Sequence, residues 1–137
     1  MSYTQDDNYN EHMTNIIFYC KALVFGKEGK CLVLRRAKDQ KWDLPGGAVH
    51  IPETHEDALR REVREETGIE TKNLTLLTCR TSHEADDSYV IFLGYRADAC
   101  STDAQLSREH TDFQWLTETE FRQCDLAPHL KDLMNEL

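Results

Sequence analysis

The segment from residue 47 to residue 69 constrains this chain more than any other part of its sequence. It contains the dense charged run Arg61-Glu62-Val63-Arg64-Glu65-Glu66. Projected as a helix at about 100° per residue, Glu62, Glu65 and Glu66 fall within an arc of roughly 100°. The pattern therefore predicts one helix with three carboxylates on the same face.

Three neighbouring carboxylates repel one another, by a few tenths of a kcal/mol when exposed and by roughly 3 kcal/mol at ~6 Å and an effective dielectric near 20. One interpretation of such a run is an ordinary solvated, charged helix surface. The other is a binding site for a hard divalent cation, because Mg²⁺ and Mn²⁺ take oxygen ligands and complete their coordination with water and substrate phosphates. The second interpretation explains why the repulsion is tolerated.

Both ends of this helix are marked. Thr54 and Asp57 have the spacing of a capping box, and Gly68 can adopt the left-handed conformation just past the end, so we expect about 13 helical residues. The preceding Gly46 and Gly47 predict a tight turn at which the backbone can approach a ligand closely.

The segment resembles the Nudix box, G-x(5)-E-x(7)-R-E-U-x-E-E-x-G-U with U aliphatic, and it matches every defined position. The flanking sequences 31–36 and 42–47, and the pairs Glu109-His110 and Trp115-Leu116, are also similar to the family. The resemblance implies an α/β fold, the Nudix-type α/β/α sandwich with a mixed β-sheet.

The resemblance also implies roles for individual residues. Glu62, Glu65 and Glu66 are expected to bind Mg²⁺ or Mn²⁺, with Glu109 as an additional ligand or a plain surface residue. Glu62, Glu65 and Arg61 are the expected catalytic residues, with Arg61 orienting a box glutamate. Substrate binding is expected of Arg36, Gly46 and Gly47. Glu53 is either a ligand or, like Gly68, a structural box residue.

The implied activity is metal-dependent hydrolysis of a diphosphate bond in a nucleoside triphosphate or a related nucleoside diphosphate linked to another group. The MutT-like nucleoside triphosphate pyrophosphohydrolase group is favoured, which includes enzymes acting on oxidised nucleotides such as 8-oxo-dGTP. The proline of ADP-ribose-cleaving members and the tyrosine of diadenosine-polyphosphate members are both missing near 85–87.

Two other functions stay open: a non-catalytic nucleotide-sensing or regulatory module, and hydrolysis of a nucleotide sugar or dinucleoside polyphosphate. The general base is also open, between Glu62 and the loop groups His83, Glu84 and Asp86. Four aromatic residues could stack on a base or pack in the core, namely Trp42, Phe92, Tyr95 and Trp115.

At the level of the whole chain, 137 residues suit one domain over 14–137, preceded by a polar tail over 1–13 that we expect to be disordered. A formal charge of −9 argues against a polymeric nucleic-acid partner and is compatible with a small nucleotide bound through metal. Five scattered cysteines and the lack of an 18-residue apolar run predict reduced thiols, a cytoplasmic location and no membrane association. A homodimer is expected from the resemblance.

Alternation and turn signals predict five strands, over 16–25, 31–35, 74–81, 89–97 and 113–116. A helix is expected to start after Thr117, where Glu120 completes a capping box, and a last helix is expected over 129–134.

Overall fold

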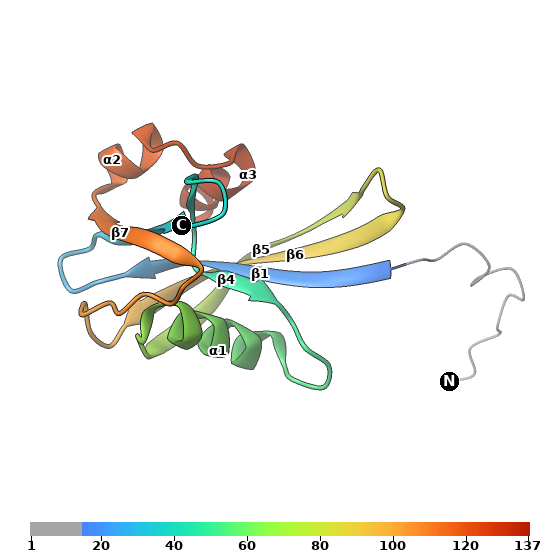
Figure 1. Ribbon diagram of the computed structural model, residues 1–137, viewed down its shortest axis with the longest axis horizontal. Helices are drawn as coiled ribbons and strands as arrows, with labels where there is room; N and C mark the ends of the chain where they lie inside the picture. Colours follow the sequence, from blue (N-terminus) through green and yellow to red (C-terminus); the bar gives the residue numbers. More distant parts are fainter. Residues whose placement is uncertain (1–14) are drawn as a thin grey trace, which may run out of the picture.

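The fold is that of a single mixed β-sheet with helices on both faces, seen in a computed structural model that describes residues 15–137 (Figure 1). The tail predicted over 1–13 lies outside the described residues. The strands are β1 (Asn15–Phe25), β2 (Cys31–Arg36), β3 (Trp42–Asp43), β4 (Gly46–Ala48), β5 (Thr71–His83), β6 (Ser88–Ala99) and β7 (His110–Leu116). The helices are α1 (His55–Thr67), α2 (Glu118–Gln123), α3 (Pro128–Lys131) and the 3₁₀ helix η1 (Asp132–Glu136).

The sheet has the order β3-β2-β1-β6-β5, with β4 paired to β1 and β7 paired to β2. Strands β1 and β6 run parallel over their whole length, and the other pairs are antiparallel. This arrangement confirms the predicted mixed sheet.

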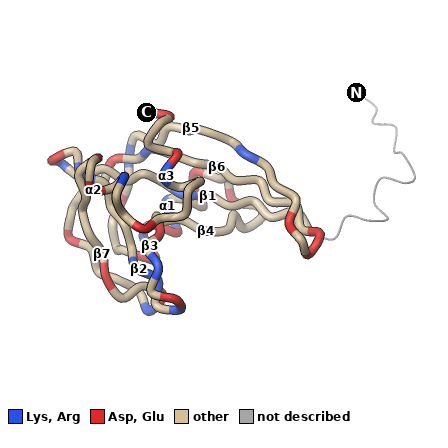
Figure 2. The backbone as a smooth tube through the Cα atoms, turned by 90° about the horizontal axis from the view of Figure 1, so that it is seen from above, with Lys and Arg blue, Asp and Glu red and all other residues tan. Residues whose placement is uncertain are grey.

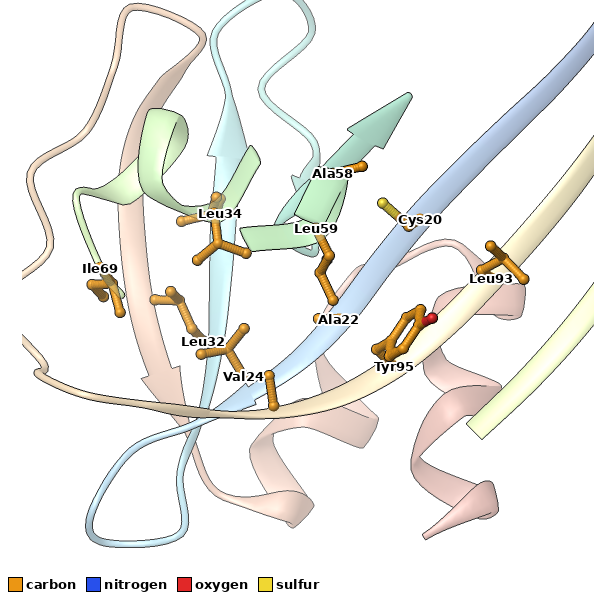
Figure 3. Packing of buried hydrophobic residues seen from close by; sticks show 12 residues of the cluster. Cys20, Ala22, Val24, Leu32, Leu34, Ala58, Leu59, Ile69, Leu93 and Tyr95 are labelled. Carbon is orange, nitrogen blue, oxygen red and sulfur yellow. The ribbon is translucent and has the colours of Figure 1, made fainter. Parts of the chain in front are cut away.

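Two hydrophobic cores lie on opposite sides of the sheet. One packs Leu59 and Val63 of α1 against Ala22 of β1, and Figure 3 shows this layer from close by. The other packs Phe121 of α2 and Leu133 of η1 against the opposite face. Because helices cover both faces, the structure confirms the α/β/α sandwich.

Strand β1 owes its apolar sequence to this central position. Cys20, Ala22 and Val24 face the core beneath α1, whereas Leu23 faces the core beneath the C-terminal helices. A strand buried on both faces reads as a continuous apolar run. Lys21 interrupts the run although it is only 4% exposed, which marks it as part of a polar site.

Helix α1 has the predicted 13 residues and the predicted ends. The Thr54 side chain accepts a hydrogen bond from the Asp57 amide at 3.1 Å, and Gly68 adopts a left-handed conformation with φ of 71°. The Asp57 carboxylate accepts from Arg60 at 3.3 Å, so only the threonine half of the predicted capping box is formed. At α2, the predicted capping box of Thr117 and Glu120 is complete.

Several elements differ in length from those predicted. Strands β5, β6 and β7 extend beyond the predicted ranges, and the last helix is divided into α3 and η1. Strands β3 and β4 were not predicted, because two and three residues are too few to show a periodicity. The tight turn predicted at Gly46 and Gly47 is wrong, because both residues belong to β4, and the pairing with β1 places them against the middle of the sheet.

The β5–β6 hairpin and the start of β1 extend beyond α1 as an arm, and acidic residues gather at the hairpin tip (Figures 1 and 2). The five cysteines all lie within the described residues and are free thiols. Across residues 15–137, no helix is long and apolar enough to span a membrane.

Candidate functional site

A cleft of about 640 Å³ opens where β1, β2, β4, α1 and the start of β7 meet. Its walls carry both signs of charge. The lining residues are Tyr19, Lys21, Arg36, Ala37, Lys38, Asp43, Gly46, Gly47, Glu62, Glu66, Arg108, Glu109 and His110.

The paired glycines of β4 bring α1 close to the sheet. Gly46 has φ of 140° and donates its N–H to Glu66 Oε1 at 2.9 Å. A Cβ at Gly46 would lie 2.0 Å from the Cys20 carbonyl oxygen, and a Cβ at Gly47 would lie 2.6 Å from the Glu62 carboxyl carbon. The backbone at Gly46 and Gly47, which was expected to approach a ligand, thus approaches two box glutamates, Glu66 and Glu62.

Glu66 is the most deeply buried acidic residue of the box, at 3% exposure. Burial raises the pKa of its carboxyl to about 8, against the lowering effects of Lys21 and of the Gly46 hydrogen bond. A carboxylate in this position gains little from solvent, so binding a cation is a favourable way to keep it ionised at neutral pH.

Lys21 supplies a fixed positive charge on the cleft floor. Its ammonium group donates to Asp43 Oδ2 at 3.0 Å, to the Leu44 carbonyl at 3.0 Å and to the Gly46 carbonyl at 3.4 Å. Asp43 helps to raise the pKa of Lys21 above its ordinary value despite the opposing effect of burial. With three donors engaged, Lys21 holds the chain from Asp43 to Gly46 in place.

Arg61 joins three of the four box glutamates, Glu53, Glu62 and Glu65, to one another. Its guanidinium donates to both carboxylate oxygens of Glu53, at 3.0 and 2.7 Å, and to the Ala48 carbonyl at 3.1 Å. The remaining nitrogen contacts Glu62 at 3.1 Å and Glu65 at 3.2 Å.

Glu53 is occupied by structural contacts and does not line the cleft. It accepts the His50 amide at 2.8 Å as well as the Arg61 hydrogen bonds. These hydrogen bonds, with Arg61 contributing most, lower the pKa of Glu53 to about 2. The geometry favours the structural reading of Glu53 over the metal-ligand reading.

Glu109 and His110 complete the acidic side of the cleft. One potential ligand atom from each of Glu66, Glu109 and His110 lies within 4.8 Å of the other two, a spacing that suits a shared divalent cation. His110 is 8% exposed, and burial, together with the charge of Lys21, lowers its pKa. This donor set fits a metal ion.

The predicted site residues divide into two groups. The cleft brings together Arg36, Gly46, Gly47, Glu62, Glu66 and Glu109. The other predicted site residues, Glu53, Arg61, Glu65 and Gly68, are absent from the lining. The Glu65 side chain is 59% exposed and paired with Arg61. His83, Glu84 and Asp86, the loop residues considered as the general base, lie at the tip of the β5–β6 hairpin. They line neither this cleft nor a second cleft beside it, which is described below.

Sequence reasoning missed five polar lining residues, namely Lys21, Lys38, Asp43, Arg108 and His110. Lys21 could have been found as the single charge within the apolar run of β1. His110 was part of the quoted Glu109-His110 pair but received no role. Asp43 likewise lay within the quoted sequence 42–47 but received no role, and Lys38 and Arg108 lie outside the strands and carry no local signal.

A second cleft of about 490 Å³ adjoins the first and shares Tyr19, Lys21, Arg36 and Asp43 with it. Its far wall is formed by Trp42 and by the chain from Asp125 to Leu130. His129 in this wall packs edge-on against Phe92, with ring centroids 5.3 Å apart. Of the four aromatic residues named from sequence, only Trp42 lines this cleft, and Tyr95 and Phe92 are buried.

Comparisons with known proteins agree with this geometry. The family profile of the NUDIX domain matches residues 20–137. A MutT-like protein from Streptomyces ambofaciens is 35% identical over 100 residues, covering 72% of this chain and 62% of that protein. The nucleoside triphosphatase NudI from Escherichia coli O81 is 32% identical over 115 residues, covering 72% of this chain and 81% of NudI.

A solved structure shows the same fold. The MutT protein from Methanosarcina mazei Go1 superposes with a TM-score of 0.75 at 27% identity, over 89% of this chain and 92% of that one. A box complete at every position, an α/β/α sandwich and a profile match over most of the chain define one class of protein. This chain belongs to the Nudix hydrolase family.

Proposed function

We propose that this chain is a metal-dependent hydrolase that cleaves a diphosphate bond in a nucleoside triphosphate or a related nucleoside diphosphate derivative. The observation that carries the proposal is the placement of Glu66. It is 3% exposed, yet its carboxylate lies within 4.8 Å of ligand atoms of Glu109 and His110. A carboxylate buried without metal is a liability for stability, whereas in a metal site it is a ligand.

The metal site would be formed by Glu62, Glu66 and Glu109, with Glu65 as a fourth carboxylate that can leave its exposed ion pair with Arg61. The expected ion is Mg²⁺ or Mn²⁺. When bound, it would neutralise phosphate charge and lower the pKa of a water molecule.

The basic residues of the cleft would hold the phosphates. Arg36, Lys38 and Arg108 all line its walls, and Figure 2 shows basic positions near the β2–β3 turn. Arg36 is held by Asp39, to which its Nε donates at 3.0 Å. An arginine fixed in this way presents its remaining donors with little loss of conformational entropy.

Glu62 is the proposed proton acceptor. It lines the cleft, its side chain is 15% exposed, and Arg61 contacts it at 3.1 Å. The hairpin candidates line neither cleft, which removes the geometric reason for assigning them the role.

The second cleft would hold the base and sugar. It shares its floor with the phosphate cleft, so one extended ligand can occupy both. Trp42 offers an aromatic face, and His129 offers ring nitrogens in a wall fixed by Phe92. An oxidised purine triphosphate such as 8-oxo-dGTP remains one proposed substrate, and a nucleotide sugar or dinucleoside polyphosphate is the alternative.

The second candidate function is a non-catalytic nucleotide-sensing or regulatory module. A structural neighbour with the same fold holds a nucleotide derivative: the NUDIX domain of Shewanella oneidensis NrtR was solved in complex with ADP ribose, at 21% identity and a TM-score of 0.75. Such a module would bind a nucleotide without turnover.

A substrate panel separates these functions. Nucleoside triphosphates, oxidised nucleotides, nucleotide sugars, dinucleoside polyphosphates and a 5′-triphosphorylated RNA would each be incubated with Mg²⁺ or Mn²⁺ and followed by phosphate release. Turnover of a free nucleotide supports the proposal, and binding without turnover of any compound supports the sensing module. Preferential turnover of the RNA would overturn the expectation that polymeric nucleic acid is not a partner.

The proposal extends to the cellular setting and the oligomeric state. Five free thiols suit a reducing, cytoplasmic compartment. A homodimer is proposed by family resemblance, and light scattering of the purified chain would measure its mass directly.

A further inference from the structure

His110 occupies a position in the cleft that the proposed activity leaves without a role. It begins β7, directly after Glu109, and its side chain is 5% exposed. Its Nε2 lies 3.4 Å from Glu66 Oε2, and its Nδ1 has no hydrogen-bond partner among residues 15–137. The nitrogen placed to share an ion with Glu66 is therefore Nε2, and the buried, unpaired Nδ1 is a separate feature with its own desolvation cost.

We infer that His110 is a metal ligand, so that one imidazole nitrogen binds the ion in this cleft together with the carboxylates of the proposed site. The ligand atoms of Glu66, Glu109 and His110 already lie within 4.8 Å of one another. This inference rests on the proposed function, because it concerns the same metal ion.

A nitrogen ligand changes which ion the site prefers. Mg²⁺ takes oxygen ligands and retains its waters, whereas imidazole binds first-row transition metal ions with affinities that rise from Mn²⁺ towards Ni²⁺ and Cu²⁺. The site formed by Glu66, Glu109 and His110 therefore selects a transition metal ion over Mg²⁺. Oxygen ligands alone would not provide this selectivity.

The competing explanation is that His110 only positions Glu66 by donating a hydrogen bond to it. The 3.4 Å contact between Nε2 and Oε2 is long for a bond to a carboxylate. A positioning role predicts weaker metal binding in a variant but no bond from nitrogen to metal. The two explanations therefore differ in a spectroscopic signature.

The test is electron spin echo envelope modulation of the full chain loaded with Mn²⁺. A coordinated imidazole gives ¹⁴N modulation, and growth with ¹⁵N-histidine should abolish it. His110→Phe, which keeps an aromatic ring at this buried position, should also abolish it. His83→Gln, at the hairpin tip, is the matched control and should retain the modulation.

Affinity provides the second readout. Titration of His110→Phe should show Mn²⁺ binding weakened about 10- to 100-fold, with Mg²⁺ binding changed by less than about 3-fold. The inference is overturned if Mn²⁺ binds the wild-type chain in a Glu66-dependent way without histidine modulation, and the proposed hydrolase then still stands. If neither ion binds with or without a non-hydrolysable nucleotide, the proposed function fails together with the inference.

Discussion

Gly47 and Glu62 are in contact in a way that leaves no room for a side chain at position 47. A Cβ there would lie 2.6 Å from the Glu62 carboxyl carbon and 2.7 Å from its nearer oxygen. The contact explains in steric terms why a glycine that begins the box must accompany a glutamate 15 residues later along the chain.

Gly47→Ala should reduce activity while leaving the fold nearly intact. The clashing atoms are the end of a flexible side chain, so Glu62 can rotate away at little cost in folding free energy. A displacement of about 1 Å of a catalytic group can cost about 10²-fold in rate. Steady-state kinetics and denaturant unfolding of the same variant check both parts.

Gly46→Ala, in contrast to Gly47→Ala, should lower the stability of the fold. Its Cβ would meet the Cys20 carbonyl oxygen at 2.0 Å, and its φ of 140° disfavours any side chain. Because backbone cannot rotate away, we expect a loss of at least ~2 kcal/mol in the free energy of unfolding. Equal loss of stability in the two variants would contradict the steric account of Gly47.

Metal-free protein should lose stability relative to Glu66→Gln as the pH rises. The folded pKa of Glu66 is about 8, above its ordinary value of 4.5, so between these values the folded state holds a proton that the unfolded state has released. Stability falls with pH wherever the folded state binds more protons. The difference between the two proteins should change by about 3 kcal/mol from pH 5 to pH 8.

Urea unfolding with a chelator present, at several pH values, measures this difference. The subtraction removes the contributions of other titrating groups, such as Glu53, which are common to both proteins. Added Mg²⁺ or Mn²⁺ should restore stability to the wild type at pH 8 and have little effect on Glu66→Gln. A difference that stays constant with pH would show that Glu66 is not a strained, buried acid.

Arg61→Lys should lower both stability and activity. An ammonium group cannot donate to Glu53 through two parallel bonds while also reaching Glu62 and Glu65. We expect a loss of about 1–3 kcal/mol in unfolding free energy and a clear fall in kcat. Arg60→Lys is the matched control on the same helix, because Arg60 contacts Asp57 at the surface. Similar losses in both variants would contradict the role of Arg61.

His129→Ala should affect substrate binding more than turnover. His129 lines the second cleft and has no place beside the glutamates. If that cleft holds the nucleobase of the substrate, KM should rise roughly tenfold with kcat changed by less than about 3-fold, the pattern of a uniform binding contact. A fall in kcat at unchanged KM would show that the nucleobase binds elsewhere.

Much of this structure could be predicted from local sequence. The ends of α1 follow from Thr54 and Gly68, and the α2 cap follows from Thr117 and Glu120, because capping depends on residues three or four apart. The mixed sheet and its two helical layers followed from the family resemblance.

The remainder depends on contacts between distant residues. Helix projection placed Glu62, Glu65 and Glu66 on one face, but it could not show that Glu66 accepts from Gly46 of β4 while Glu65 turns outward to Arg61. Lys21 and Asp43 are 22 residues apart and meet only because β3 pairs with β2 beside β1. Such pairings are set by tertiary packing, which no short sequence window contains.

The most direct test of the central claim is the rate of phosphate release from the best nucleotide substrate, with Mg²⁺ or Mn²⁺, by the wild-type chain and by Glu62→Gln and Glu66→Gln. The proposed mechanism predicts that each substitution lowers kcat/KM by at least ~10²-fold, equivalent to about 2.7 kcal/mol of transition-state stabilisation. Rates unchanged by both substitutions would contradict a metal-dependent hydrolase site formed by the box glutamates.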